Sequence, residues 1–168
     1  IAIHAHSIPQ VFRNDTEAEA EAARPASLAH REDWRQMPLI TIDPPDAKDH
    51  DDAVHAERDS ATGNHGGFIL TVAIADVSHY VTPGSALDRE AQVRGNSVYF
   101  PDRVVPMLPE ALLNGLCSLV PGEDRACLAA HLWIDASGRK LRHRFERAIM
   151  RSAARLTYEQ VQGVRDGA

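Results

Sequence analysis

The pattern of apolar and polar residues predicts a series of short strands. In each of the segments concerned, apolar or β-branched residues either dominate or alternate with polar ones. The predicted strands are residues 1–6, 39–42, 52–58, 68–75, 97–100, 126–135 and 139–147. Gly and Asn residues at positions 62–67 suit a turn between two of them, and Ser137-Gly138 predicts a hairpin between the last two. Most neighbouring strands are therefore expected to be antiparallel.

Helices are expected between these strands. They are predicted at residues 17–23, 85–94 and 110–119, and from residue 157 onward. Asp15 or Thr16 is the expected cap of the first helix, and Thr157 and Gln160 have the spacing of a capping box at the start of the last. The mixture predicts an α+β fold, with a mixed, largely antiparallel sheet and flanking helices.

Acidic residues crowd the segment between the strands at 39–42 and 52–58. Five aspartates fall within ten residues there, offset only by Lys48: Asp43, Asp46, Asp49, Asp51 and Asp52. Two carboxylates about 5 Å apart repel by roughly 3 kcal/mol at an effective dielectric of about 20. A fold that gathers them must raise their pKa values or bind cations. We expect a metal site in this anchored loop, with a solvated acidic loop or a calcium-stabilised turn as alternatives.

Composition narrows the possible partners. The 168 residues, 43% of them hydrophobic, suffice for one domain with a core, and no apolar run approaches the roughly 18 residues of a membrane span, so we expect no membrane association. Cys117 and Cys127 lack metal-site spacing and predict reduced thiols in a cytoplasmic protein. A net charge of −6 argues against broad capture of nucleic acid. A polyanionic ligand would need bound cations or a local basic stripe.

The spacing of the acids resembles the catalytic loop of the ribonuclease II / ribonuclease R exoribonucleases. Thr-Ile-Asp-x-x-Asp-Ala-x-Asp-x-Asp-Asp-Ala occupies residues 41–53. Collinear matches follow: VAIADVSHYV at 72–81, LDREA at 87–91, RGNSVYFP at 94–101, VPMLPE at 105–110, CSL at 117–119 and RLTY at 155–158. The resemblance is strongest to the bacterial ribonuclease R branch, and it is loose over the first 38 residues.

This resemblance implies a domain organisation and an activity. Residues 39–168 would be the N-terminal part of the catalytic domain, called RNB, after a connector at residues 1–38. Family members hydrolyse RNA from a single-stranded 3′ end with Mg²⁺, for which Mn²⁺ is the alternative, and release nucleoside 5′-monophosphates. Full-length members add OB-fold RNA-binding domains and a second catalytic half that supplies a transition-state arginine. The chain begins without methionine, so we expect a piece of a longer polypeptide that is inactive alone.

The family's pattern also implies roles for the acids. Phosphodiester hydrolysis needs an activated water and charge relief on the leaving 3′-oxygen, which a pair of magnesium ions supplies. The aspartates that would hold the metal are Asp43, Asp49, Asp51 and Asp52. Asp49 and Asp51 would be catalytic, with Asp51 the more critical. Asp46 lies outside the pattern, and His50 is expected to turn away from its neighbours and to pack or lie at the surface.

Two tyrosines match RNA-binding positions of the family. Tyr99 matches a residue that stacks on the 3′-terminal base and helps set product length, and Tyr158 one that contacts RNA near the scissile end and favours ribose. Such stacking is worth about 1–3 kcal/mol per base and tolerates any sequence. A packed tyrosine is the alternative at each position. The candidate phosphate contacts, each with a simple surface charge as the alternative, are Arg94, Arg103 and Arg155.

Two other functions stay open. The first is a non-catalytic RNA-binding or regulatory RNB-like module. Degenerate copies usually lose acids from the loop, and all four are present here, which favours the enzyme. The second is another class of metal-dependent phosphoesterase built on Asp49-His-Asp-Asp, against which the matches around Tyr99 argue.

Overall fold

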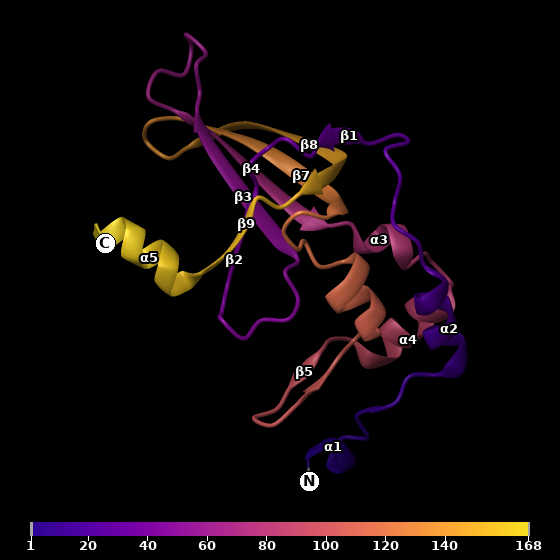
Figure 1. Cartoon of the computed structure of the whole chain (residues 1–168). Coiled ribbons are helices and arrows are strands. Elements are labelled where there is room, and N and C mark those ends of the chain that lie inside the picture. The colour runs from indigo at the N-terminus through magenta and orange to yellow at the C-terminus, as the bar shows by residue number, and fades with distance from the viewer. Residues whose placement is uncertain (1, 168) are drawn as a thin grey trace. The chain divides into compact units, whose positions relative to one another are not determined.

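The computed structural model describes residues 2–167, and they fall into two compact units. One, here called the helical unit, combines the chain up to residue 24 with residues 77–116. The other, the sheet unit, combines residues 25–76 with the chain from residue 117 onward. Together they confirm the predicted α+β class (Figure 1).

A seven-stranded sheet forms the sheet unit, in the order β1-β8-β7-β4-β3-β2-β9 (Figure 1). Its strands are β1 (Glu32–Trp34), β2 (Ile40–Asp43), β3 (Asp52–Arg58), β4 (Phe68–Ala75), β7 (Asp124–Ile134), β8 (Lys140–Arg151) and β9 (Ala154–Thr157). The pairs β1–β8 and β2–β9 are parallel, and the other neighbours are antiparallel. This confirms the mixed, largely antiparallel sheet. Helix α5 (Tyr158–Asp166) follows β9 directly.

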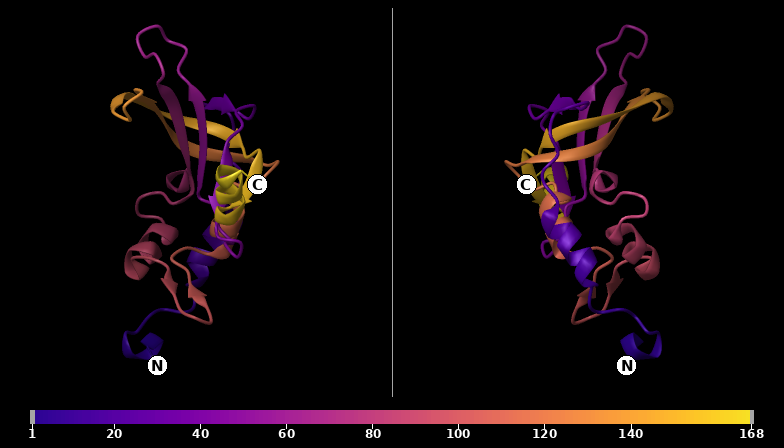
Figure 2. Two further views of the ribbon diagram at one scale, coloured as in Figure 1. Left: turned by 90° about the vertical axis from the view of Figure 1, so that its left-hand side faces the viewer. Right: turned by 90° about the vertical axis from the view of Figure 1, so that its right-hand side faces the viewer.

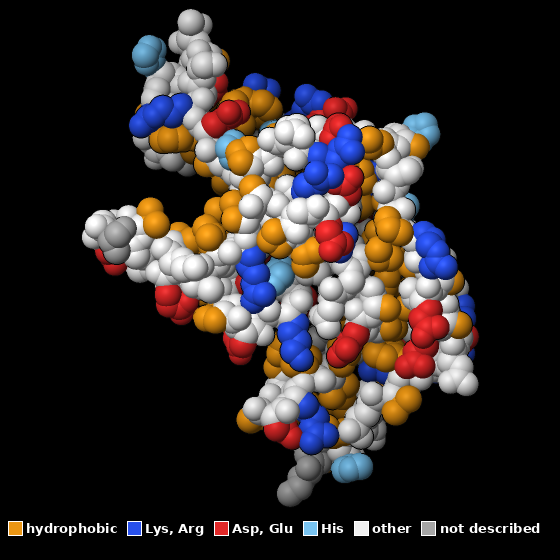
Figure 3. All heavy atoms as spheres, viewed as in Figure 1, with side chains coloured by type: hydrophobic (Ala, Val, Ile, Leu, Met, Phe, Trp, Pro, Cys, Tyr) orange, Lys and Arg blue, Asp and Glu red, His pale blue; other side chains and the backbone are white. Residues whose placement is uncertain are grey.

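Small side chains fill one face of the central strands. Thr71 and Ala73 on β4 are buried, and Ala73 lies opposite the buried Ala129 of β7. On the other face of the same strands, Ile74 pairs with Leu128, and both are exposed, at 44% and 45%. Apolar side chains consequently reach the surface of the sheet unit (Figure 3). The alternation of the sequence thus separates a packed face from an apolar face that stays open.

A buried ion pair ties the segment before β1 to the residue after β4. Arg31 Nη2 lies 2.7 Å from Asp76 Oδ2, and the two side chains are only 5% and 1% exposed. A buried charge is tolerated only when it is paired, so each residue fixes the other. This contact anchors residue 31 beside the central strands.

The helical unit consists of short elements. They are α1 (Ala2–Ala5), α2 (Asn14–Ala22), α3 (Val77–Tyr80), α4 (Ala86–Arg94), β5 (Val98–Tyr99), β6 (Val104–Val105) and the π-helix η1 (Ala111–Leu116). Strands β5 and β6 pair antiparallel as a small hairpin. No helix in residues 2–167 has both the length and the apolar character needed to cross a membrane.

Arg94 organises this unit. Its guanidinium bonds to Glu90 Oε1 at 3.0 Å, donates to the carbonyls of Pro9 and Pro106, and stacks 3.6 Å from the Phe12 ring centroid. The Arg94 side chain is only 2% exposed. Arg94 is therefore a structural residue of the helical unit, and neither of the two roles considered from the sequence describes it.

Several local predictions are confirmed because their signals are local. Ser85 Oγ accepts from Asp88 N at the start of α4, and the capping box of Thr157 and Gln160 is complete. The predicted cap of α2 is wrong, because Arg13 occupies that position without a side-chain hydrogen bond.

Two further local predictions need correction. The strand predicted at residues 1–6 is wrong: Ala2–Ala5 is helical, and the Ile8 N–H donates back to Ile3 O, while Ile1 lies outside the described residues. The helix predicted at 110–119 is shorter, and takes the wider π form.

Leu39 tests the packing on which the sheet unit depends. It is fully buried, and its carbonyl accepts from Ala153 N at 2.8 Å. Leu39→Ala should lower the free energy of unfolding by about 2–5 kcal/mol, because truncation of a packed leucine leaves a cavity. Urea denaturation checks this, with Leu141→Ala as the control, since Leu141 is 45% exposed. Equal effects of the two substitutions would contradict the assignment of Leu39 to the core.

Candidate active site

The acidic loop, defined here as residues 43–52, is held at both ends by the sheet. Asp43 is the last residue of β2 and Asp52 the first of β3, and these strands are antiparallel neighbours. Ala75 N donates to Asp51 O at 2.8 Å, which fixes the backbone just before β3. The loop is therefore anchored by strand pairing, as its sequence predicts.

Residues from the C-terminal half of the chain hold the middle of the loop. The Leu119 N–H donates to His50 O at 2.6 Å, and the His50 N–H donates to Ser118 Oγ at 3.2 Å. Arg155 Nη2 donates to the carbonyls of Pro45 and Ala47, at 3.0 Å each. Arg155 thus fastens the acidic loop, which is a role that the sequence does not reveal.

His50 contacts one of the acids directly, a contact that the sequence analysis does not predict. Its Nδ1 lies 2.8 Å from Asp43 Oδ2, and both residues are buried, with 3% and 8% exposure. Its burial confirms the prediction that it packs, and Asp43 is not one of the two sequence neighbours from which it was expected to turn. One feature of the sequence could have predicted the contact between His50 and Asp43: a histidine lies inside a cluster of acids. A buried carboxylate needs a hydrogen-bond donor, and an imidazole N–H can supply it.

Three of the four predicted acids influence one another electrostatically. Partial burial of the Asp52 carboxyl raises its pKa, and the negative charges of Asp51 and then Asp43 raise it further. Asp51 and Asp52 are exposed, whereas Asp49 is half-buried. Asp46, outside the family's pattern, is exposed. The loop therefore concentrates uncompensated negative charge around Asp52.

The acids have the right chemistry for a hard cation without being arranged as a closed cage. Carboxylate oxygens are the ligands that magnesium prefers, and one or two of them usually suffice beside water and substrate phosphate. No set of three or more His, Cys, Asp or Glu side chains within residues 2–167 is spaced to hold a metal ion. The raised pKa of Asp52 is the observation that fits a cation, because a positive charge there would relieve it.

Tyr158 begins helix α5 directly after β9, the strand that pairs with β2 at the start of the acidic loop. Thr157, the last residue of β9, is in register with Asp43 on β2, so Tyr158 follows directly after Asp43's partner. Its side chain is 57% exposed at the first position of α5, whose capping box fixes the local backbone. Exposure makes the aromatic ring available for a ligand instead of committing it to core packing.

Tyr99 belongs to the helical unit, on β5. Its side chain is 70% exposed, and its backbone pairs with Val104 of β6. Arg103, a candidate phosphate contact, is an exposed residue that pairs with Asp102 Oδ2 at 2.8 Å. Neither Tyr99 nor Arg103 is a packed core residue.

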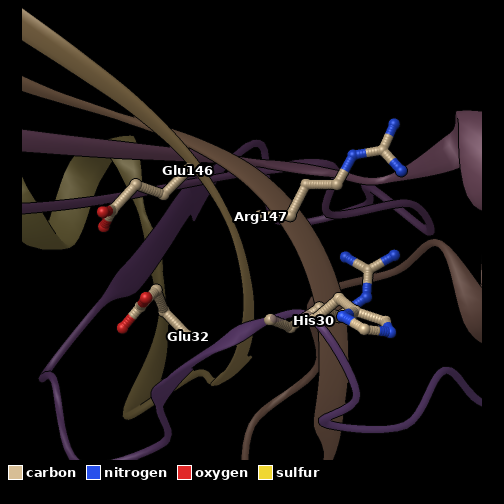
Figure 4. Close-up of a pocket in the computed structure, with 5 residues that line it drawn as sticks. His30, Glu32, Glu146 and Arg147 are labelled. Carbon is tan, nitrogen blue, oxygen red and sulfur yellow. The ribbon is translucent and has the colours of Figure 1, made fainter.

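A separate pocket of about 330 Å³ lies elsewhere in the sheet unit. Five residues line it: His30, Arg31, Glu32, Glu146 and Arg147. Figure 4 shows the two carboxylates on one side, with His30 and Arg147 on the other. Its walls are therefore of mixed charge, unlike the acidic loop, and none of its five lining residues is an acid of that loop.

Comparison with known proteins assigns the family. The model of the RNB domain matches residues 31–168. Ribonuclease R of Acidithiobacillus ferrooxidans is 50% identical over 99% of this chain and 38% of its own length, and ribonuclease R of Escherichia coli (strain K12) is 46% identical over 99% and 20%. The chain thus spans about a fifth to two fifths of these relatives.

A solved structure agrees with the sequence comparison. Mycoplasma genitalium RNase R in complex with double-stranded RNA superimposes with a TM-score of 0.90 and 34% identity, over 98% of this chain and 29% of that one. The matched regions include the acidic loop and both tyrosines. On the length and identity of these matches, this chain belongs to the RNB domain family.

Proposed function

We propose that this chain is the N-terminal part of the catalytic domain of a 3′-to-5′ exoribonuclease, which hydrolyses RNA phosphodiesters and releases nucleoside 5′-monophosphates. The observation that carries the proposal is the complete set of four aspartates on one anchored loop: Asp43, Asp49, Asp51 and Asp52. Two further findings support it: the sequence relatives are ribonucleases R, and a similar solved structure is an RNase R in complex with RNA.

Magnesium, or manganese in its place, is the cofactor that we propose for the acidic loop. Asp43 and Asp52 would be direct ligands, and Asp49 would complete the site. When bound, the cation would supply a water of lowered pKa and charge relief at the leaving 3′-oxygen. The raised pKa of Asp52 supports this assignment, since its carboxylate lacks a compensating positive charge.

The chain's own residues would orient the site. His50 Nδ1 bonds to Asp43 and holds that carboxylate in place, which is the usual task of an outer partner of a ligand. The Asp51 backbone is fixed by Ala75 while its side chain stays exposed, so its carboxylate can reach substrate and water. Arg155, on β9, holds the backbone of the loop through its hydrogen bond to the Pro45 carbonyl, beside the pairing of β9 with β2.

We propose that the substrate is a single-stranded RNA 3′ end, held by Tyr99 and Tyr158. Exposure of both rings supports stacking or edge contacts with RNA over core packing. The open apolar face around Ile74 and Leu128 supports a larger catalytic domain, in which further residues cover it. The proposal includes OB-fold RNA-binding domains elsewhere in the parent chain. It also places the boundary between the connector and the catalytic domain at residue 38.

A cytoplasmic location completes the proposal. Cys117 and Cys127 are both free thiols, and burial raises the pKa of each to about 12. Such thiols are inert and suit a reducing compartment.

Asp51→Asn tests the chemistry in the full-length parent. The substitution keeps the shape of the side chain but removes a charge, so hydrolysis of a 5′-labelled oligoribonucleotide with Mg²⁺ should fall by about 10²-fold or more, while RNA binding survives. Asp46→Asn removes the same charge from an exposed position of the same loop and should change little. Loss of binding and hydrolysis to the same degree would show that Asp51 serves folding instead of catalysis. Unchanged hydrolysis would refute the proposed function.

Tyr99→Ala tests the 3′-end contact. Stacking worth about 1–3 kcal/mol matters most for short RNAs, which have few other contacts. Turnover of long RNA should stay nearly intact in the full-length parent, while the end products become longer by one or more nucleotides. A gel of limit products beside a melting curve measures both effects. An unchanged product ladder with a lower melting temperature would instead assign Tyr99 to packing.

A further inference from the structure

Positive charge is concentrated in one strand of the sheet unit. Six of the chain's 18 lysines and arginines, but only one of its 24 acidic residues, lie between Arg139 and Arg151. This segment is β8 with the residue before it. The chain as a whole has a formal net charge of −6, so a local excess of five positive charges is a marked segregation.

The outer half of β8 is exposed along its length. Arg142 and Arg144 are two residues apart and therefore point to the same face, about 6.6 Å apart along the backbone. A register shift between Trp133 and Ile134 interrupts the alternation before Arg142, and Lys140 lies beside His143. Residues 140–145 are all exposed, and β1 pairs with β8 only from Ala148 to Met150. Figure 2 shows the β7–β8 hairpin, orange to yellow, extending away from β3 and β4. No other strand of the described chain pairs with this outer edge of β8.

Aromatic side chains are interleaved with these cations. Arg142 lies over the Trp133 ring of β7, 3.4 Å from its centroid. On the opposite face Phe145 is 67% exposed, and its ring stands edge-on to His143 at 5.1 Å between centroids. Cations that follow a strand, with aromatic rings beside them, are the combination that binds single-stranded nucleic acid without sequence preference.

Internal pairing neutralises only part of this charge. Four of the six cations have a carboxylate partner: Arg139 pairs with Asp135, Arg144 with Glu146, Arg147 with Asp76 and Arg151 with Asp124. Lys140 contacts His143, which provides no negative charge, and Arg142 lies over Trp133. A row of like charges is held at a cost unless a polyanion neutralises it. An acidic protein surface would satisfy the cations but would have no use for the exposed ring of Phe145.

We propose that the outer half of β8, from Arg139 to Phe145 with Trp133 beside it, is a second RNA-binding surface that holds the phosphate backbone of single-stranded RNA. This inference rests on the proposed function for its ligand, but it assigns a surface distinct from the acidic loop and from both tyrosines. It also resolves how a chain of net negative charge admits a polyanion, through a local basic strip.

An RNA-binding assay tests this surface. Fluorescence anisotropy measures the binding of a fluorescein-labelled 20-nucleotide oligoadenylate to this chain, in EDTA and at several salt concentrations. Lys140→Gln/Arg142→Gln should weaken binding about tenfold at low salt, and should reduce the slope of log K against log[salt] by about 1.4, because two phosphate contacts are lost. Arg13→Gln/Arg24→Gln removes the same charge from exposed positions of the helical unit and should change neither. Circular dichroism confirms folding of both variants.

The inference would be overturned if this chain showed no measurable binding of RNA, or if the two double variants weakened binding equally. Competition by polyglutamate as strong as that by unlabelled RNA would also overturn it, because it would assign the strip to an acidic protein. A duplex RNA of equal charge that binds as tightly as the oligoadenylate would also contradict the single-strand assignment. Hydrolysis by the parent enzyme is measured separately. Normal hydrolysis with unaffected binding in Lys140→Gln/Arg142→Gln refutes this surface and leaves the proposed function intact.

Discussion

Repulsion between carboxylates in the acidic loop is the constraint on which the site depends. Partial burial raises the pKa of Asp52, and the charges of Asp51 and Asp43 lie close enough to raise it further. A free loop would relax this repulsion by moving apart. Here the backbone is fixed by β2 and β3, by Ala75 and by Leu119, so the charges stay together. The fold thus keeps the carboxylates together before any cation binds, so that the site for a positive charge is preorganised.

The anchors of the loop come from distant parts of the chain. Ser118 and Leu119 hold His50, and Arg155 holds the carbonyls of the loop. Strand β9 brings Thr157 into register with Asp43, and Tyr158 begins α5 directly after it. A mutation near residue 155 could therefore disturb the acidic loop without touching an acid, because the loop and β9 form one paired structure.

Sequence patterns predicted the parts of the fold whose signals are local. The strands at 52–58 and 68–75 follow from alternation around a glycine-rich turn, and the capping box of Thr157 needs only four residues. The short parallel strands β1 and β9 were missed because their partners lie more than a hundred residues away. The bond from His50 to Asp43 was missed because the two residues are seven positions apart and only the folded loop brings them together. The exposed tyrosines could be predicted only through family resemblance.

Thermal melting of this chain with and without Mg²⁺ tests the central claim most directly. Without the cation, Asp52→Asn should melt higher than the unmodified chain near neutral pH, because the raised pKa of Asp52 means that its ionisation costs stability there. With Mg²⁺ at about 100 times its Kd, the unmodified chain should gain about 5–10 °C, whereas Asp43→Asn/Asp52→Asn should gain little. Asp46→Asn should behave as the unmodified chain. An equal gain in the double variant would place the cation elsewhere and contradict the account.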